Sequence, residues 1–106
     1  MGRKKDMGIN VQLEDEGGGV IEAVQDPRSL TKQALIDHKE SVCLRFVNPY
    51  GDAVFNQMQA PVLLSELKNA QNKKLTAEAH EHLRSVISLV ERAQGQTHTY
   101  IRFVGD

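Results

Sequence analysis

The sequence predicts a two-layer α+β domain in which a mostly antiparallel sheet of four or five strands carries helices on one face. Short runs that alternate nonpolar and polar residues occur near both ends and in the middle of the chain, as in half-buried strands. Other stretches repeat nonpolar residues at helical spacing. Taken in chain order, these runs predict the elements ββαββααβ.

The chain has 106 residues, which is the length of a single domain spanning 1–106. Area scaling for 11.8 kDa lets roughly 65% of the unfolded surface be buried, so a core can form without disulfide or metal. Residues 1–7 contain the basic run Arg3-Lys4-Lys5. We expect them to be a disordered tail, because chain termini are ordered only where contacts tie them down.

The first third of the chain predicts a β-hairpin followed by a helix. Nonpolar and polar residues alternate over 9–14, a second short strand covers 20–24, and glycines at 17–19 connect them. Asp26 can accept the free amides of a first helical turn, and Pro27 tolerates the first helical position. The helix should fade near residues 38–40, and its nonpolar face is formed by Leu30, Ala34 and Leu35.

The middle of the chain predicts a second hairpin. Residues 42–47 read VCLRFV, a run rich in β-branched and aromatic residues. Residues 48–51 read NPYG, which suits a tight turn, and 53–56 would be the returning strand.

The second half predicts two helices and a closing strand. Pro61 starts the first helix, residues 72–74 end it, and Thr76 can cap the second, which should end near Gly95. The closing strand covers 97–104. The nonpolar positions predict a core of Val11, Leu13, Leu44, Phe46, Ile101 and Phe103 from strands, and Leu30, Leu35, Leu63, Leu67, Leu83, Ile87 and Val90 from helices.

The alternation of side chains along the predicted strands also predicts a polar and aromatic outer face on the sheet. Residues 44–47 (LRFV) and 101–104 (IRFV) match in type, so their arginines should point away from the helices. Arginine and tyrosine are enriched at binding hot spots. Cross-strand ion pairs, such as Glu14 with an arginine, or an anion site on both arginines would also explain this face. The outer face is predicted to carry Asn10, Gln12, Glu14, Cys43, Arg45, His98, Tyr100 and Arg102.

Candidate chemistry is sparse along the chain. Cys43 and His98 could form a thiolate pair only if their strands are adjacent, and a nonpolar packing role explains the cysteine equally. His80 and His82 are two apart, so on a helix they point about 200° apart and cannot share one metal ion. We therefore expect no cofactor, no metal and no catalytic residue. The candidate binding residues are Arg45, Tyr50, Asp52, His98, Tyr100 and Arg102.

Composition argues against nucleic acid and membrane as partners and indicates a cellular compartment. The formal net charge is -1, and neither half is basic enough to grip a phosphate backbone, so nucleic acid is disfavoured. The densest nonpolar cluster, residues 62–64, is far shorter than a membrane span. A single cysteine allows no intrachain disulfide and fits a reducing compartment, so we expect a cytoplasmic protein.

These observations favour a small, non-enzymatic protein-interaction module. It would be an immunity-like or regulatory accessory protein that contacts a protein partner or a second copy of itself. The alternative is a small enzyme or ligand-binding domain, with its site where the outer sheet face meets residues 48–52 and with His98, Tyr100, Cys43 and the arginines contributing. Single-stranded nucleic acid on the open sheet ranks third, because Tyr100 is the one aromatic residue expected there.

Overall fold

The computed structural model describes residues 8–26, 28–35, 40–48 and 50–105. Our expectations for residues 1–7, for Pro27 and for most of the predicted helix end at 38–40 lie outside these ranges. The elements are β1 (Asn10–Asp15), β2 (Val20–Val24), α1 (Leu30–Leu35), the 3-10 helix η2 (Leu44–Phe46), β3 (Asp52–Phe55), α2 (Ala60–Ala70), α3 (Ala77–Ala93) and β4 (Thr99–Val104).

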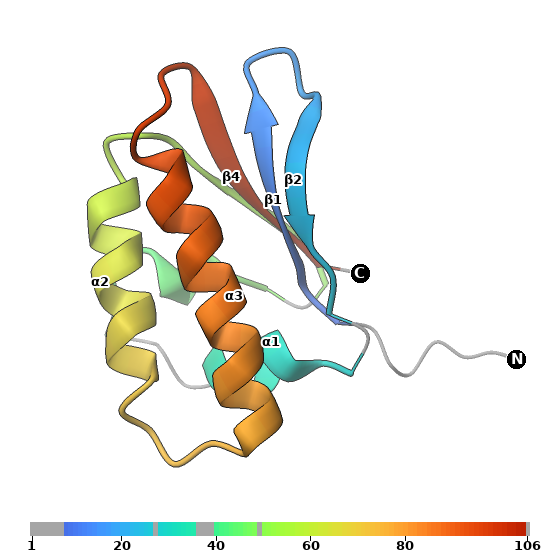
Figure 1. The fold of residues 1–106 in the computed structure, drawn as a ribbon, viewed down its shortest axis with the longest axis vertical. Helices are drawn as coiled ribbons and strands as arrows, with labels where there is room; N and C mark the ends of the chain where they lie inside the picture. Colours follow the sequence, from blue (N-terminus) through green and yellow to red (C-terminus); the bar gives the residue numbers. More distant parts are fainter. Residues whose placement is uncertain (1–7, 27, 36–39, 49, 106) are drawn as a thin grey trace, which may run out of the picture.

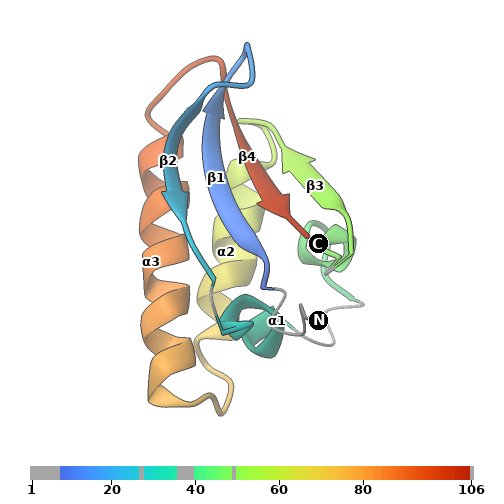
Figure 2. The same cartoon turned by 90° about the vertical axis from the view of Figure 1, so that its right-hand side faces the viewer.

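The strands form one antiparallel sheet of four strands in the order β2-β1-β4-β3. Helices α2 and α3 lie on one face of this sheet, and α1 packs against α3 near the start of β1 (Figures 1 and 2). The predicted α+β two-layer class is therefore confirmed. The first hairpin is also confirmed, since β1 pairs with β2 across the glycine-containing connection.

The predicted strand over 42–47 is wrong, and so is its hairpin with 53–56. Residues 44–46 form η2 instead, and β3 pairs with β4. Glu66 of α2 explains the change, because its carboxylate accepts the amides of Val42, Cys43 and Leu44 at 2.6, 3.0 and 3.0 Å. Three successive amides aimed at one side chain cannot belong to a strand, in which consecutive amides point in opposite directions.

The turn that follows η2 keeps part of its predicted chemistry. Asn48 accepts the amide of Tyr50 through its side chain at 2.8 Å and the amide of Gly51 through its carbonyl at 3.3 Å. This turn leads into β3, which begins at Asp52 rather than at the expected residue 53. It therefore joins η2 to an edge strand of the sheet.

The two long helices follow the predicted pattern. Helix α2 has proline in its first turn and ends before the polar residues 72–74. Thr76 caps α3, because its hydroxyl accepts the amide of Ala79 at 3.1 Å. The stripe of nonpolar residues along α3 is buried against the sheet and against α2.

One hydrophobic core joins the sheet to the helices. The rings of Phe55 and Phe103 meet edge to face, with centroids 5.8 Å apart. Phe46 was wrongly placed in this core: it is 60% exposed because η2 does not alternate as a strand would. Leu30 is only partly buried, and the remaining residues predicted for the core are buried.

Candidate functional site

The face of the sheet opposite α2 and α3 has no helix over it among the described residues (Figure 2). Side chains alternate along each strand, so the residues next to the buried ones point to this side. We call it the outer face. It carries Gln12 and Glu14 of β1, Val20 and Ile21 of β2, Asp52 and Val54 of β3, and Tyr100 and Arg102 of β4.

Arg102 links three strands on the outer face. Its Nε donates to Oε2 of Glu14 at 2.9 Å, and its Nη1 donates to Oδ2 of Asp52 at 3.2 Å. The hydrogen bond to Glu14 is the main reason that the pKa of Arg102 is raised, and Asp52 adds to it. The cross-strand ion pair expected for Glu14 is thus present. An anion site would have to compete with both carboxylates for this arginine.

Glu14 is unusually buried for a carboxylate on an uncovered face. Its side chain is 7% exposed, although β1 is a central strand whose outer face meets solvent. The residues directly opposite it are Tyr100 on β4 and Val20 on β2. A bulge in the β1–β2 register places Ile21 beside Val20. We attribute the burial of Glu14 to the large side chains that flank it on both sides.

A shallow depression of about 250 Å³ lies beside Glu14. The side chains of Val54, Tyr100 and Arg102 line it on the strand side. The hairpin between β1 and β2 lines the other side, through Asp15, Glu16 and Gly18. Small-molecule sites commonly enclose about 300–1,000 Å³, so this depression is better suited to a single side chain than to a metabolite.

The structure brings together only part of the predicted site. Asp52, Tyr100 and Arg102 share the outer face. Arg45 does not, because it belongs to η2, where its guanidinium lies 5.2 Å from the centre of the Phe46 ring. Tyr50 projects from the turn before β3 and is 73% exposed.

His98 stands at the end of the sheet rather than on a strand. It has a positive φ of 58° and precedes β4, so it does not follow the alternation of that strand. Its Nδ1 lies 3.1 Å from Oε2 of Glu16, and both side chains are exposed. His98 is therefore a neighbour of the hairpin, whose residues line the depression.

The pairing of Cys43 with His98 on one strand face is wrong. Cys43 lies outside the sheet, just before η2, and its thiol is 3.9 Å from the carbonyl oxygen of Gln59. Burial raises the pKa of the thiol, and the nearby charge of Glu66 raises it further. A buried thiol with a raised pKa is a poor nucleophile, and Cys43 acts as a small core residue.

A second polar cluster, which the sequence did not reveal, connects α1 to α3. Nε2 of His82 lies 2.5 Å from Oγ1 of Thr31 and 3.9 Å from Oδ1 of Asp26. Burial is the main cause of the lowered pKa of His82, and the charge of Asp26 opposes it. Both partners meet the same ring nitrogen, whereas a hydroxyl–histidine–carboxylate relay uses both nitrogens. The cluster is consequently a structural link.

His80 and His82 diverge, as helical geometry requires. Nδ1 of His80 lies 2.6 Å from Oε1 of Gln71, at the end of α2, while His82 turns to α1. Within the described ranges, no group of three or more His, Cys, Asp or Glu side chains is arranged to hold a metal ion.

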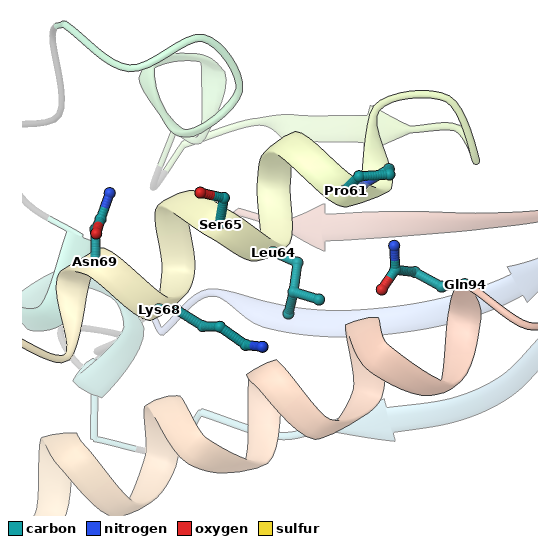
Figure 3. A pocket seen from close by; sticks show the side chains of 6 residues that line it. All are labelled: Pro61, Leu64, Ser65, Lys68, Asn69 and Gln94. Carbon is teal, nitrogen blue, oxygen red and sulfur yellow. The ribbon is translucent and has the colours of Figure 1, made fainter.

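Two further surface features were not foreseen. Four exposed nonpolar side chains flank η2 and the start of α2, namely Val42, Phe46, Met58 and Val62. A cleft of about 400 Å³ lies between α2 and the end of α3, where Leu64, Lys68 and Gln94 are among the lining residues (Figure 3). Lys68 makes a 3.4 Å ion pair with Glu91, so its charge is already matched.

In comparisons with known proteins, no protein family model, no curated protein and no solved structure matches this chain. Across the part of the chain that the structure describes, no helix is both long enough and nonpolar enough to cross a membrane.

Proposed function

We propose that this chain is a non-enzymatic accessory protein of immunity-like or regulatory type, and that its outer face binds another protein. The observation that carries the proposal is the set of large nonpolar and aromatic side chains on that face. Val20, Ile21, Val54 and Tyr100 are 55, 46, 45 and 37% exposed. A solvated face of an antiparallel sheet ordinarily carries polar residues, and nonpolar side chains gathered there mark interaction sites.

The ion pairs at the centre of the outer face support the same proposal. Arg102 holds Glu14 and Asp52 from two neighbouring strands, so the polar part of the surface is ordered before a partner arrives. Association then loses less side-chain entropy than it would on a surface of free side chains. The rigid sheet backbone adds to this preorganisation.

Charge favours a basic partner over nucleic acid or a second copy. One arginine on the outer face is shared by Glu14 and Asp52, and the adjacent hairpin adds Asp15 and Glu16. A phosphate backbone would meet this negative surplus unfavourably. Two outer faces brought together would juxtapose the same surplus, whereas a partner with basic residues would complement it.

The alternative of a small enzyme or ligand site has less support. The depression is smaller than most metabolite sites, and Cys43 lies outside the sheet. A single buried cysteine is compatible with the reducing cytoplasm, where we place the interaction.

Two matched valines provide the test. Val54 on the outer face and Val62 on α2 are 45 and 41% exposed, so V54K and V62K add the same charge at sites of similar exposure. We expect V54K to capture at least tenfold less partner from the source cells than the unchanged protein does. V62K should capture as much as the unchanged protein. Circular dichroism and native mass spectrometry would verify the fold and the oligomeric state. Equal capture by both variants, or a loss confined to V62K, would overturn the proposal.

A further inference from the structure

Glu14 has an unused hydrogen-bonding position. Its side chain is more than nine-tenths buried, and Oε2 accepts a hydrogen bond from Arg102. Among the described residues, no donor is bonded to its Oε1. A carboxylate has about four lone-pair positions, and burying one with few donors is costly. A further donor on Glu14 would therefore be favourable.

The surroundings determine the charge that this donor should carry. Arg102 is shared between Glu14 and Asp52, so the group of three has one positive and two negative charges. Asp15 lines the same depression, and its Oδ1 accepts the amides of Gly17 and Gly19 at 2.9 and 2.8 Å. Backbone amides are neutral donors, so they do not offset the negative charge of the Asp15 carboxylate. The depression consequently has a net negative charge and favours a cation.

The wall of the depression determines the shape of the cation. Tyr100 stands directly across from Glu14 in the sheet register, and both line the depression with Val54. Its ring is an aromatic surface beside a carboxylate. A guanidinium can stack on an aromatic face while its N–H groups donate to a neighbouring carboxylate. The volume of about 250 Å³ admits one long side chain rather than a folded segment.

We propose that the depression beside Glu14 receives an arginine side chain of the protein partner, with its guanidinium close to the carboxylate of Glu14 and to the ring of Tyr100. This inference rests on the proposed function and names the anchor that the partner supplies. Arginine is among the residue types that dominate binding energy at interfaces. The partner is thereby defined as a protein with an exposed arginine at the centre of a surface that also covers Val20 and Val54.

The first test uses N-acetyl-arginine amide as the probe and N-acetyl-citrulline amide as its uncharged control. Titration is followed by ¹H–¹⁵N NMR on the full chain. We expect saturable shifts that include the amides of Gly18, Val54 and Tyr100 for the arginine compound, and at least tenfold weaker binding of the citrulline compound. Equal responses to both compounds, or shifts spread over the molecule, would overturn the inference.

The second test separates Glu14 from charge in general. E14Q removes the charge at the depression, and E22Q removes the same charge from the side of β2 that faces α3, where Glu22 pairs with Arg92. We expect E14Q to weaken the probe at least tenfold and E22Q to leave it within about twofold. The spectrum of each variant reports whether its fold is retained. Similar losses of probe affinity in both variants would show that the probe responds to the overall charge of the protein and not to Glu14. That result would contradict the inference.

The capture experiment with V54K and V62K keeps this inference distinct from the function on which it rests. If V54K alone loses the partner while the probe fails to bind, the interaction face stands and the arginine anchor is wrong. If the probe binds selectively while V54K and V62K capture the partner equally, the partner binds another surface. In that case the outer face is not the binding surface, and the partner does not supply the arginine anchor.

Discussion

Nε of Arg102 on β4 donates to Oε2 of Glu14 on β1 at 2.9 Å, which ties the two central strands together on the face opposite the helices. The same guanidinium reaches Asp52 on the edge strand β3. Since the Glu14 side chain is buried and that of Asp52 is 43% exposed, the two contacts differ in importance. A buried carboxylate depends on its partner far more than an exposed one does.

The first prediction concerns this difference. R102M should lower the free energy of unfolding more than D52N does, because it leaves Glu14 charged, buried and without its described hydrogen-bond donor. Adding E14Q to R102M should restore part of the loss by removing the unpaired charge. Urea unfolding followed by circular dichroism measures all of these variants. A larger loss for D52N than for R102M would contradict the assignment.

The second prediction concerns the capping of η2 by Glu66. E66A removes the acceptor of three amides, at Val42, Cys43 and Leu44, and should cost about 2 kcal/mol of unfolding free energy. E81A is a suitable control, because Glu81 lies on α3 in an exposed pair with Arg84. It should cost less than about 0.5 kcal/mol. Equal losses in chemical denaturation would show that Glu66 does not hold η2 in place.

The third prediction concerns pH. Burial lowers the pKa of His82 in the folded chain below its ordinary value of 6.5, so below that pH the unfolded chain binds a proton that the folded chain does not. Stability should therefore fall as the pH drops below about 6.5, by at most about 1.4 kcal/mol per pH unit for one proton. H82Q should show a shallower fall over pH 7.5 to 5.0. Identical slopes for both proteins in urea titrations would contradict this role.

The fourth prediction compares two phenylalanines that the sequence treats alike. Phe103 is fully buried and meets Phe55, so F103A should cost about 3–5 kcal/mol. Phe46 is 60% exposed, so F46A should change stability by no more than about 0.5 kcal/mol. Thermal or urea unfolding distinguishes the two. A large loss of stability in F46A would indicate that Phe46 is buried, as the predicted strand over 42–47 required.

Local pattern predicted most of the fold, and its largest error has a long-range origin. The strands predicted over 9–14, 20–24 and 97–104 are found as β1, β2 and β4, although β1 covers 10–15 and β4 begins only at Thr99, and the helical stripes of α2 and α3 are buried as expected. Residues 42–47 have the composition of a strand, but Glu66, more than twenty positions away, binds their amides. No local pattern contains that contact, so propensity alone gave the wrong element.

The candidate site was also predictable only in part. Tyr100 and Arg102 lie on a correctly predicted strand, so their facing followed from alternation. The prediction for Arg45 was wrong because residues 44–46 form η2 and not a strand. The prediction for His98 was wrong because its left-handed backbone conformation places it outside the alternation of β4. The contact of Thr31 with His82 joins residues far apart in the chain, and neither residue carries a local signal of it.

The most direct test of the proposed interaction face is site-specific photo-crosslinking in the source cells. Benzoylphenylalanine replaces Val20 on the outer face in one protein and Glu81 on the exposed side of α3 in another. We predict a covalent product with a different protein from position 20 and none from position 81, with the crosslinked partner peptide containing or adjoining an arginine. Equal products at both positions, or no product at position 20, would contradict the assignment of the outer face as the binding surface.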